Sequence, residues 1–171
     1  ANKSESYEIC FVPDNDYRAF LRNKVQDLDE RIGPGNFMLN DGSIVGKHQG
    51  YPFYTIGQRK GLGVAYEYPL YVVRLDGVKN EVIVGPNESL YTKKMICKHY
   101  NFLSGTIPQE LHANGKIRYA ANPSPCVARI LDDETMEVEF EEPQRAITPG
   151  QSVVFYDGTQ VLGGGVIEVV Q

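Results

Sequence analysis

Three cysteines supply the only thiols of this 171-residue chain, and a thiolate is a strong nucleophile. Cys10 has the setting that a reactive thiol needs, because it falls in a short predicted strand, residues 7–12, shortly before a predicted helix. The positive end of that helix dipole would favour the ionised sulfur. Cys126 shares a predicted strand face with apolar residues, which indicates a core position, whereas the pattern around Cys97 does not place it. Since most free cysteines are buried and inert, an incidental Cys10 stays an open alternative.

A cationic, glycine-rich loop is the second candidate. It has the sequence GQRKGLG over Gly57–Gly63 and follows a predicted strand over residues 53–56. Three glycines release the backbone from the steric limits of a Cβ atom, and Arg59 and Lys60 stand between them. Such a loop suits a phosphate or an RNA backbone, so we interpret Arg59 and Lys60 as residues on a path for the substrate. A solvated hairpin loop is the simpler interpretation.

Two cations and an aromatic residue recur in the segment Lys116–Tyr119, whose sequence is KIRY. A predicted strand over residues 116–121 would place Lys116 and Arg118 on one face. Proteins hold single-stranded or looped RNA with such groups, by phosphate pairing and base stacking. An amphipathic strand with a solvated cationic face is the alternative.

Composition narrows the kinds of site that the chain can hold. Its formal net charge is -5, so any RNA contact must come from local basic patches. No C-x-x-C or His-x-His motif occurs, and no structural metal is expected. No phosphate-binding G-x-x-x-x-G-K loop occurs either, so we expect no nucleoside triphosphate site in this chain. The histidines and the paired carboxylates are interpreted as hydrogen-bonding or solvated groups.

The cysteine count and the hydropathy also bear on location. Three scattered cysteines do not form a secreted disulfide framework, which favours a reducing compartment, here the cytoplasm. No apolar run is long enough to span a bilayer, so no membrane partner is expected. The sequence opens on a polar segment without an initiator Met, and we expect it to be a piece of a longer protein.

The hydrophobic pattern predicts a mainly β chain with one helix near its start. Asp14 or Asp16 would cap that helix, which would run to about Val25. Asn40-Asp41-Gly42 and a turn over residues 77–80 predict two hairpins. Their strands are expected over residues 36–39, 43–49, 70–76 and 81–85. This part of the chain is therefore expected to be a small α+β domain.

The second half predicts a closed six-stranded antiparallel β-barrel, because short strands recur and closure removes exposed strand edges. The strands are expected over residues 96–103, 116–121, 126–131, 135–141, 152–156 and 161–170. Turns are expected at Asn114-Gly115, at Asp132-Asp133 and at Asp157-Gly158. Gly163–Gly165, inside the last strand, indicates a bend or bulge.

Several motifs, in this order, resemble those of one family. They are Ser6–Pro13 with Asp16–Leu21, Gly46–Gly50 with Tyr54–Gly63, Lys116–Tyr119, Pro143–Gln151 and Leu162–Gly165. Together they are similar to the motifs of the bacterial tRNA-specific 2-thiouridylases, and the resemblance covers almost the whole chain. The long TIGQRKGLG and AITPGQ segments are far more specific than a lone cysteine or glycine pair.

The resemblance implies sulfur transfer to C2 of the wobble uridine of tRNA. In such enzymes ATP adenylates the C2 oxygen, and a persulfide on a second catalytic cysteine, which corresponds to Cys10, supplies the sulfur. A first cysteine in the ATP-binding domain then closes a disulfide or assists sulfur release. A sulfur-carrier protein is the implied partner in the persulfide relay. The resemblance also assigns tRNA contacts to Arg118, Tyr119 and Gln151.

The family's N-terminal ATP-pyrophosphatase domain, with its SGGxDS-like loop, has no counterpart in this sequence. We therefore expect residues 1–25 to end the catalytic segment, with Cys10 and the helix. Residues 26–91 would form a central β-rich domain, and residues 92–171 a tRNA-binding barrel. Only the full-length enzyme would use ATP, and this chain alone is predicted to be inactive. A non-enzymatic RNA-binding barrel with an incidental Cys10 is the alternative, and a structural or thiol-redox protein is a third.

Overall fold

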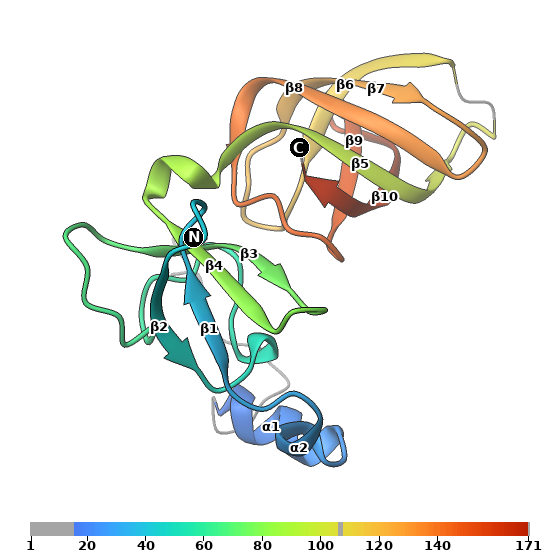
Figure 1. Ribbon diagram of the computed structural model, residues 1–171. Helices are drawn as coiled ribbons and strands as arrows, with labels where there is room; N and C mark the ends of the chain where they lie inside the picture. Colours follow the sequence, from blue (N-terminus) through green and yellow to red (C-terminus); the bar gives the residue numbers. More distant parts are fainter. Residues whose placement is uncertain (1–15, 106–107, 171) are drawn as a thin grey trace, which may run out of the picture. The chain divides into compact units, whose positions relative to one another are not determined.

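The computed structural model describes residues 16–105 and 108–170. The chain forms two compact units that divide between Glu88 and Ser89, and each is described by itself. Cys10, its predicted strand and Asp14 lie outside the described residues. The mainly β character, with a small mixed sheet first and a closed six-stranded antiparallel barrel second, confirms the predicted fold class (Figure 1).

The first unit is built on a four-stranded sheet in the order β2-β1-β4-β3. Its strands are β1 (Gly35–Met38), β2 (Ile44–His48), β3 (Tyr71–Asp76) and β4 (Glu81–Gly85). Both predicted hairpins are confirmed, and in the first the Asp41 carboxylate accepts a hydrogen bond from the Ser43 amide at 2.9 Å. The inner strands β1 and β4 are parallel, which the local sequence pattern did not indicate.

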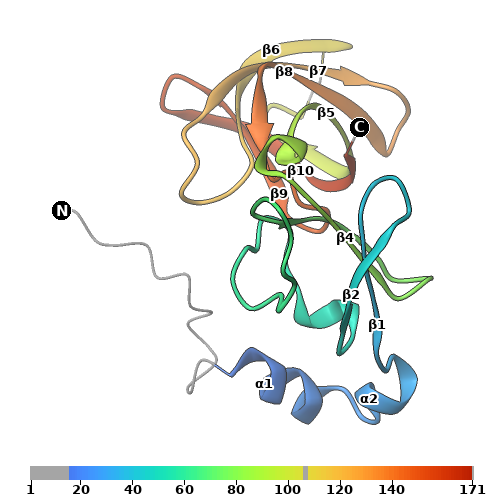
Figure 2. The same ribbon diagram turned by 60° about the vertical axis from the view of Figure 1, so that its left-hand side comes forward.

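Two helices precede this sheet, α1 (Tyr17–Lys24) and α2 (Leu28–Arg31), where one was predicted (Figure 2). Asp16 is the cap of α1, since its carboxylate accepts from the Ala19 amide at 2.9 Å. Asp27, in the left-handed conformation, separates the helices. A four-residue helix carries too few positions to show a periodic pattern, so the sequence did not reveal it.

The strand predicted over residues 53–56 is wrong. A 3-10 turn, η1 (Tyr51–Phe53), stands at its start, and the chain then continues without a ladder. Pro52 lies inside the turn and has no N–H to donate to a neighbouring strand. Gly50, just before the turn, has φ of 139°, a conformation that favours glycine, and its carbonyl accepts from the Phe53 amide.

The second unit is a closed barrel in the strand order β10-β5-β8-β7-β6-β9, and it follows a short 3-10 turn, η2 (Asn87–Leu90) (Figure 1). The strands are β5 (Tyr91–Phe102), β6 (Glu110–Lys116), β7 (Ser124–Ile130), β8 (Thr135–Arg145), β9 (Ser152–Asp157) and β10 (Gln160–Val170). The barrel interior is filled by apolar side chains, among them Met95, Cys97, Cys126, Phe140 and Phe155. The predicted core position of Cys126 is thereby confirmed, and Cys97 joins it.

One barrel strand was predicted in the wrong place. The strand expected over residues 116–121 is β6, which ends at Lys116, and the turn expected at Asn114-Gly115 lies inside it. A Cβ atom on Gly115 would stand 2.9 Å from Cys126 Sγ and 2.9 Å from a ring carbon of Phe140. Gly115 therefore allows close packing inside the barrel. The Asn-Gly pair looked like a turn signal because the sequence alone does not show this packing.

The bulge predicted at Gly163–Gly165 is confirmed, because the pairing of β10 with β5 shifts register between Gly164 and Val166. The pairing of β10 with β9 shifts register just before, between Val161 and Gly163. A Cβ atom on Gly163 would lie 2.3 Å from the Asn101 carbonyl oxygen. One on Gly164 would lie 2.4 Å from that of Val153. These glycines let the neighbouring strands approach closely enough to close the barrel.

Candidate functional site

Three residues with predicted tRNA contacts lie around one hollow of the barrel. Arg118 and Tyr119 follow β6, and Gln151 precedes β9. The strands β6 and β9 pair with each other (Figure 1). The hollow has a volume of about 560 Å³ and is also lined by Lys116 and Tyr156. We call this set, Lys116, Arg118, Tyr119, Gln151 and Tyr156, the barrel groove.

Tyr119 is almost fully exposed, with 96% of its surface open to solvent. The Lys116 ammonium lies 5.6 Å from the centre of the Tyr119 ring. Arg118 donates a hydrogen bond to the Arg145 carbonyl, which fixes one arm of the guanidinium. The groove therefore offers a ring face for stacking next to two cations, an arrangement that suits an unpaired base and its phosphate.

Backbone hydrogen bonds fix the turn that carries Gln151. The Gly150 amide donates to the Ile167 carbonyl, and the Ile167 amide donates to the Gln151 carbonyl, both at 2.8 Å. Gly150 has φ of 85°, and the Thr148 hydroxyl donates to the Ala146 carbonyl at 3.0 Å. The main chain of Gln151 is thus held against β10, and the exposed residue lines the groove.

The cations of the groove differ from those on the outer face of the barrel. There, Arg129 forms ion pairs with three carboxylates at 2.8 to 3.7 Å, and Lys94 lies 3.4 Å from Glu139. Among the ion pairs of residues 16–105 and 108–170, none involves Lys116 or Arg118. Their charges are therefore available to an anionic ligand.

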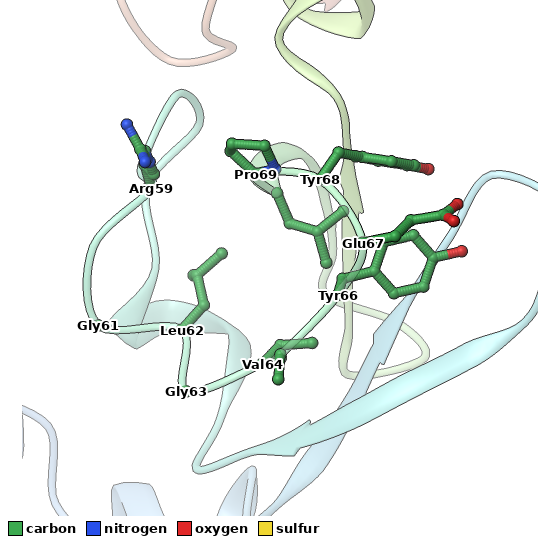
Figure 3. Close-up of a pocket in the computed structure, with 11 residues that line it drawn as sticks. Arg59, Gly61, Leu62, Gly63, Val64, Tyr66, Glu67, Tyr68 and Pro69 are labelled. Carbon is green, nitrogen blue, oxygen red and sulfur yellow. The ribbon is translucent and has the colours of Figure 1, made fainter.

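The glycine-rich loop of the first unit is held by its own side chains. Gln58 is the central residue, because its side-chain oxygen accepts from the Thr55 amide and its side-chain nitrogen donates to the Lys60 carbonyl, each at 3.0 Å. The main chain of this segment pairs with Val72 of β3. Arg59 and Lys60 are both exposed, and Arg59 lines a hollow of about 610 Å³ (Figure 3).

The two described thiols are unsuited to nucleophilic chemistry. Burial raises the pKa of Cys97 to about 12, and the neighbouring Cys126 adds to that shift. Burial likewise raises the pKa of Cys126 to about 11. Both thiols are therefore protonated near neutral pH and shielded from solvent, whereas Cys10 lies outside the described residues.

His48 is buried, with 3% of its surface exposed, and its Nδ1 accepts a hydrogen bond from the Gly50 amide at 3.0 Å. Burial lowers its pKa. This geometry requires a neutral imidazole and agrees with the predicted hydrogen-bonding role.

Within the described part of the chain, no helix is long and apolar enough to cross a membrane.

In comparison with known proteins, each unit matches the model of a known domain family. Residues 18–86 match the family model described as the tRNA methyl transferase PRC-barrel domain, and residues 92–167 match the aminomethyltransferase beta-barrel domain. The chain is 51% identical over 169 residues to the tRNA-specific 2-thiouridylase MnmA of Carboxydothermus hydrogenoformans. The chain belongs to the tRNA-specific 2-thiouridylase family.

Other relatives in this thiouridylase family show similar identity. The MnmA proteins of Clostridioides difficile and Salinibacter ruber are 46% and 47% identical to the chain. The alignments cover 98% to 99% of this chain but 45% to 46% of the three relatives. The chain thus spans about half the length of the curated relatives that it matches.

Sequence reasoning missed one side chain of the groove, Tyr156. It shares an outward face of β9 with Val154, two residues earlier, and Val154 is the pairing partner of Lys116. The period-2 pattern of the predicted strand over residues 152–156 contained that signal. Recognising its value required knowing that β9 lies beside β6, which local pattern does not supply.

Proposed function

We propose that this chain is the tRNA-binding, persulfide-bearing part of an enzyme that 2-thiolates the wobble uridine of tRNA. The barrel groove is the observation that carries the proposal, because it gathers Arg118, Tyr119 and Gln151 from distant parts of the sequence around one hollow. Family membership supports the same substrate, since the relatives are named tRNA-specific 2-thiouridylases. We also propose that the enzyme acts in the cytoplasm.

The chemistry proposed for Cys10 is a persulfide transfer. The terminal sulfur of a Cys10 persulfide attacks C2 of a uridine whose C2 oxygen carries AMP, and the C2–O bond breaks as AMP leaves. A second thiol then attacks the Cys10 sulfur, so that the S–S bond breaks, C2 keeps the sulfur and a disulfide joins the two cysteines. External thiols reduce that disulfide, and a sulfur-carrier protein reloads Cys10.

ATP supplies the adenylate in this scheme and would bind outside the 171 residues, which contain no glycine-rich phosphate loop of the G-x-x-x-x-G-K type. We therefore expect no thiouridine when this chain alone is mixed with ATP, a persulfide donor and tRNA. Mass spectrometry of digested tRNA measures the product. Clear turnover would contradict this assignment of roles.

Binding of tRNA tests the groove directly. We expect the chain to bind tRNA with an affinity that falls as salt rises, and the double variant Arg118→Ala/Gln151→Ala to bind at least tenfold more weakly. A matched control is Lys98→Ala/Gln109→Ala, which removes one cation and one amide away from the groove. Fluorescence anisotropy with labelled tRNA over a salt series gives both affinities.

The outcomes of this assay distinguish tRNA binding at the groove from tRNA binding elsewhere on the protein. A groove variant that binds as tightly as the control variant would show that tRNA is held elsewhere. Absence of binding in the unmodified chain would be followed by the same assay on a full-length relative with the equivalent substitutions. An unaffected full-length variant would then exclude the groove as a tRNA site.

A further inference from the structure

A second hollow lies in the first unit and is lined by one continuous loop, residues 59–70 except Lys60. Its volume of about 610 Å³ falls in the range of small-molecule sites. Figure 3 shows Arg59 at one side and the side chains of Tyr66 and Tyr68 leaving the loop at the other. The family motifs named above stop at Gly63, so they do not account for the tyrosines.

The tyrosines form an exposed aromatic pair. Their ring centres are 4.9 Å apart in an edge-to-face arrangement, and 40% and 36% of their surfaces are open to solvent. Neither ring belongs to the apolar core of the first unit. The exposed part of such a pair can stack on a planar ligand, and stacking on exposed tyrosine is a common way to hold an unpaired nucleobase.

The loop that carries them is anchored to the rest of the unit at Leu62 and Val64. Leu62 is buried in the core of the unit, and Val64 packs against Gly46, where a Cβ atom would stand 2.9 Å from Val64 Cγ2. Gly61 and Gly63 have φ of 77° and 68°, which favours glycine at both positions. A preformed loop loses little conformational entropy when it binds a ligand.

Charge is distributed unevenly around the hollow. Arg59 and Lys60 are exposed at the end of the glycine-rich segment, whereas the Glu67 carboxylate points the same way as the tyrosine hydroxyls, away from Arg59 (Figure 3). Partial desolvation raises the pKa of Tyr66, and Tyr68, Glu67 and Asp41 add to that shift. A phosphate is therefore favoured at the Arg59 side, and a neutral base at the tyrosine side.

We propose that this hollow binds one unpaired nucleotide of an RNA strand, with its base against Tyr66 and Tyr68 and its phosphate at Arg59 and Lys60. The Glu67 carboxylate would accept a hydrogen bond from a base amino group, which favours adenine, cytosine or guanine over uracil. That the strand belongs to a tRNA rests on the function proposed above. The nucleotide site itself rests on the loop geometry.

The test uses the 171-residue chain with the groove substitutions Arg118→Ala/Gln151→Ala, so that the barrel groove does not obscure the signal. The probe is the unstructured RNA heptamer ACACACA, followed by amide chemical shifts in NMR. We expect saturable shifts at Gly61, Gly63 and Tyr66. Tyr66→Leu/Tyr68→Leu and Arg59→Gln/Lys60→Gln should each weaken binding about tenfold.

Two controls separate the site from general effects. Tyr91→Leu removes an exposed tyrosine outside the hollow, and Lys79→Gln removes an exposed cation of the same unit, and neither should change the affinity. Absence of shifts over residues 59–70 at millimolar heptamer would overturn the inference, even if a loop variant failed to fold. This result is independent of the tRNA assay, so either proposal can fail while the other stands.

Discussion

His48 shows how one buried side chain constrains the region before the glycine-rich loop. Its ring lies 5.1 Å from that of Phe37 and 5.4 Å from that of Tyr54, and Nε2 is buried without a hydrogen-bond partner among the described residues. Nδ1 must accept from the Gly50 amide, so the proton of the neutral ring sits on Nε2. Protonation of Nδ1 would break that hydrogen bond and place a charge in an apolar site.

The stability of the first unit should therefore fall in mild acid. The pKa of His48 is lowered in the fold, so an unfolded chain takes up a proton first as the pH drops below about 6.5. The contribution of neutral His48 to the free energy of unfolding is fully present above that pH. It decreases as the pH falls toward the lowered pKa of His48 in the folded unit. Hydrogen exchange of β1 amides at pH 7.5 and 5.5 measures the loss, which His48→Asn should reduce. An equal loss in the variant would assign the pH dependence to other groups.

The thiols should react very unequally with an alkylating reagent. Cys97 and Cys126 are buried, with their pKa raised to about 12 and 11, so neither should react with iodoacetamide at pH 7.5 until the barrel unfolds. The proposed role of Cys10 requires that it react first. Peptide mass spectrometry identifies the modified residue, and Cys10→Ser is the control. Labelling of Cys126 in the folded chain would contradict the barrel core.

Residue roles were predictable to different extents. The apolar alternation around Cys126 sufficed to place it in a core, because strand period alone decides which face a side chain shares. Arg118, Tyr119 and Gln151 were named by family resemblance, and no spacing rule connects residues so far apart. The structure brings them to one hollow, while their contact with tRNA stays a prediction.

At the scale of elements, Asn80 joins three segments of the first unit. Its side-chain oxygen accepts from the Tyr51 amide at 3.1 Å, and its side-chain nitrogen donates to the carbonyls of Ile32, Gly33 and Pro34 at 2.8 to 3.2 Å. Asn80 also has φ of 52°, which asparagine tolerates better than most residues. The end of α2, the start of β1 and the turn η1 are thus tied to the β3–β4 turn.

Asn80→Asp should destabilise the first unit by about 2 to 3 kcal/mol, because a carboxylate cannot donate to three carbonyls and would repel them. Asn40→Asp is the matched control, since Asn40 is an exposed turn residue of the same unit. Hydrogen exchange of β1 and β4 amides reports the free energy of opening. Equal effects of the two substitutions would show that these side-chain bonds contribute little.

The elements were predictable where local signals decide them. The Asp41-Gly42 turn and the apolar alternation in β7, β8 and β9 are local signals that mark where these elements begin and end. The three strands lie within a few residues of the predicted ranges. Two errors arose where packing overrides local preference. Gly115 imitates a turn but serves close packing, and the β-prone run after Phe53 follows a 3-10 turn that contains a proline. The parallel pairing of β1 with β4 depends on chain topology, which has no local signal.

The division between Glu88 and Ser89 separates two compact units, each with its own apolar core. Every strand of the barrel contributes to the core of the second unit, and the closed sheet has no exposed edge. We expect residues 89–171, expressed alone, to give a β-type circular dichroism spectrum and one cooperative thermal transition. A spectrum without ordered structure would show that the barrel needs the first unit to fold.

The path of the chain through the barrel has a further consequence. The chain enters at β5 and passes last through β10, and these strands are antiparallel neighbours in which Met95 pairs with Val170. Entry and exit therefore open at the same rim. A module with this property can be spliced into a surface loop of a host protein by gene fusion, without cutting a strand or stretching the host loop. The barrel could therefore be inserted into another protein as one unit, and its groove would keep its structure there.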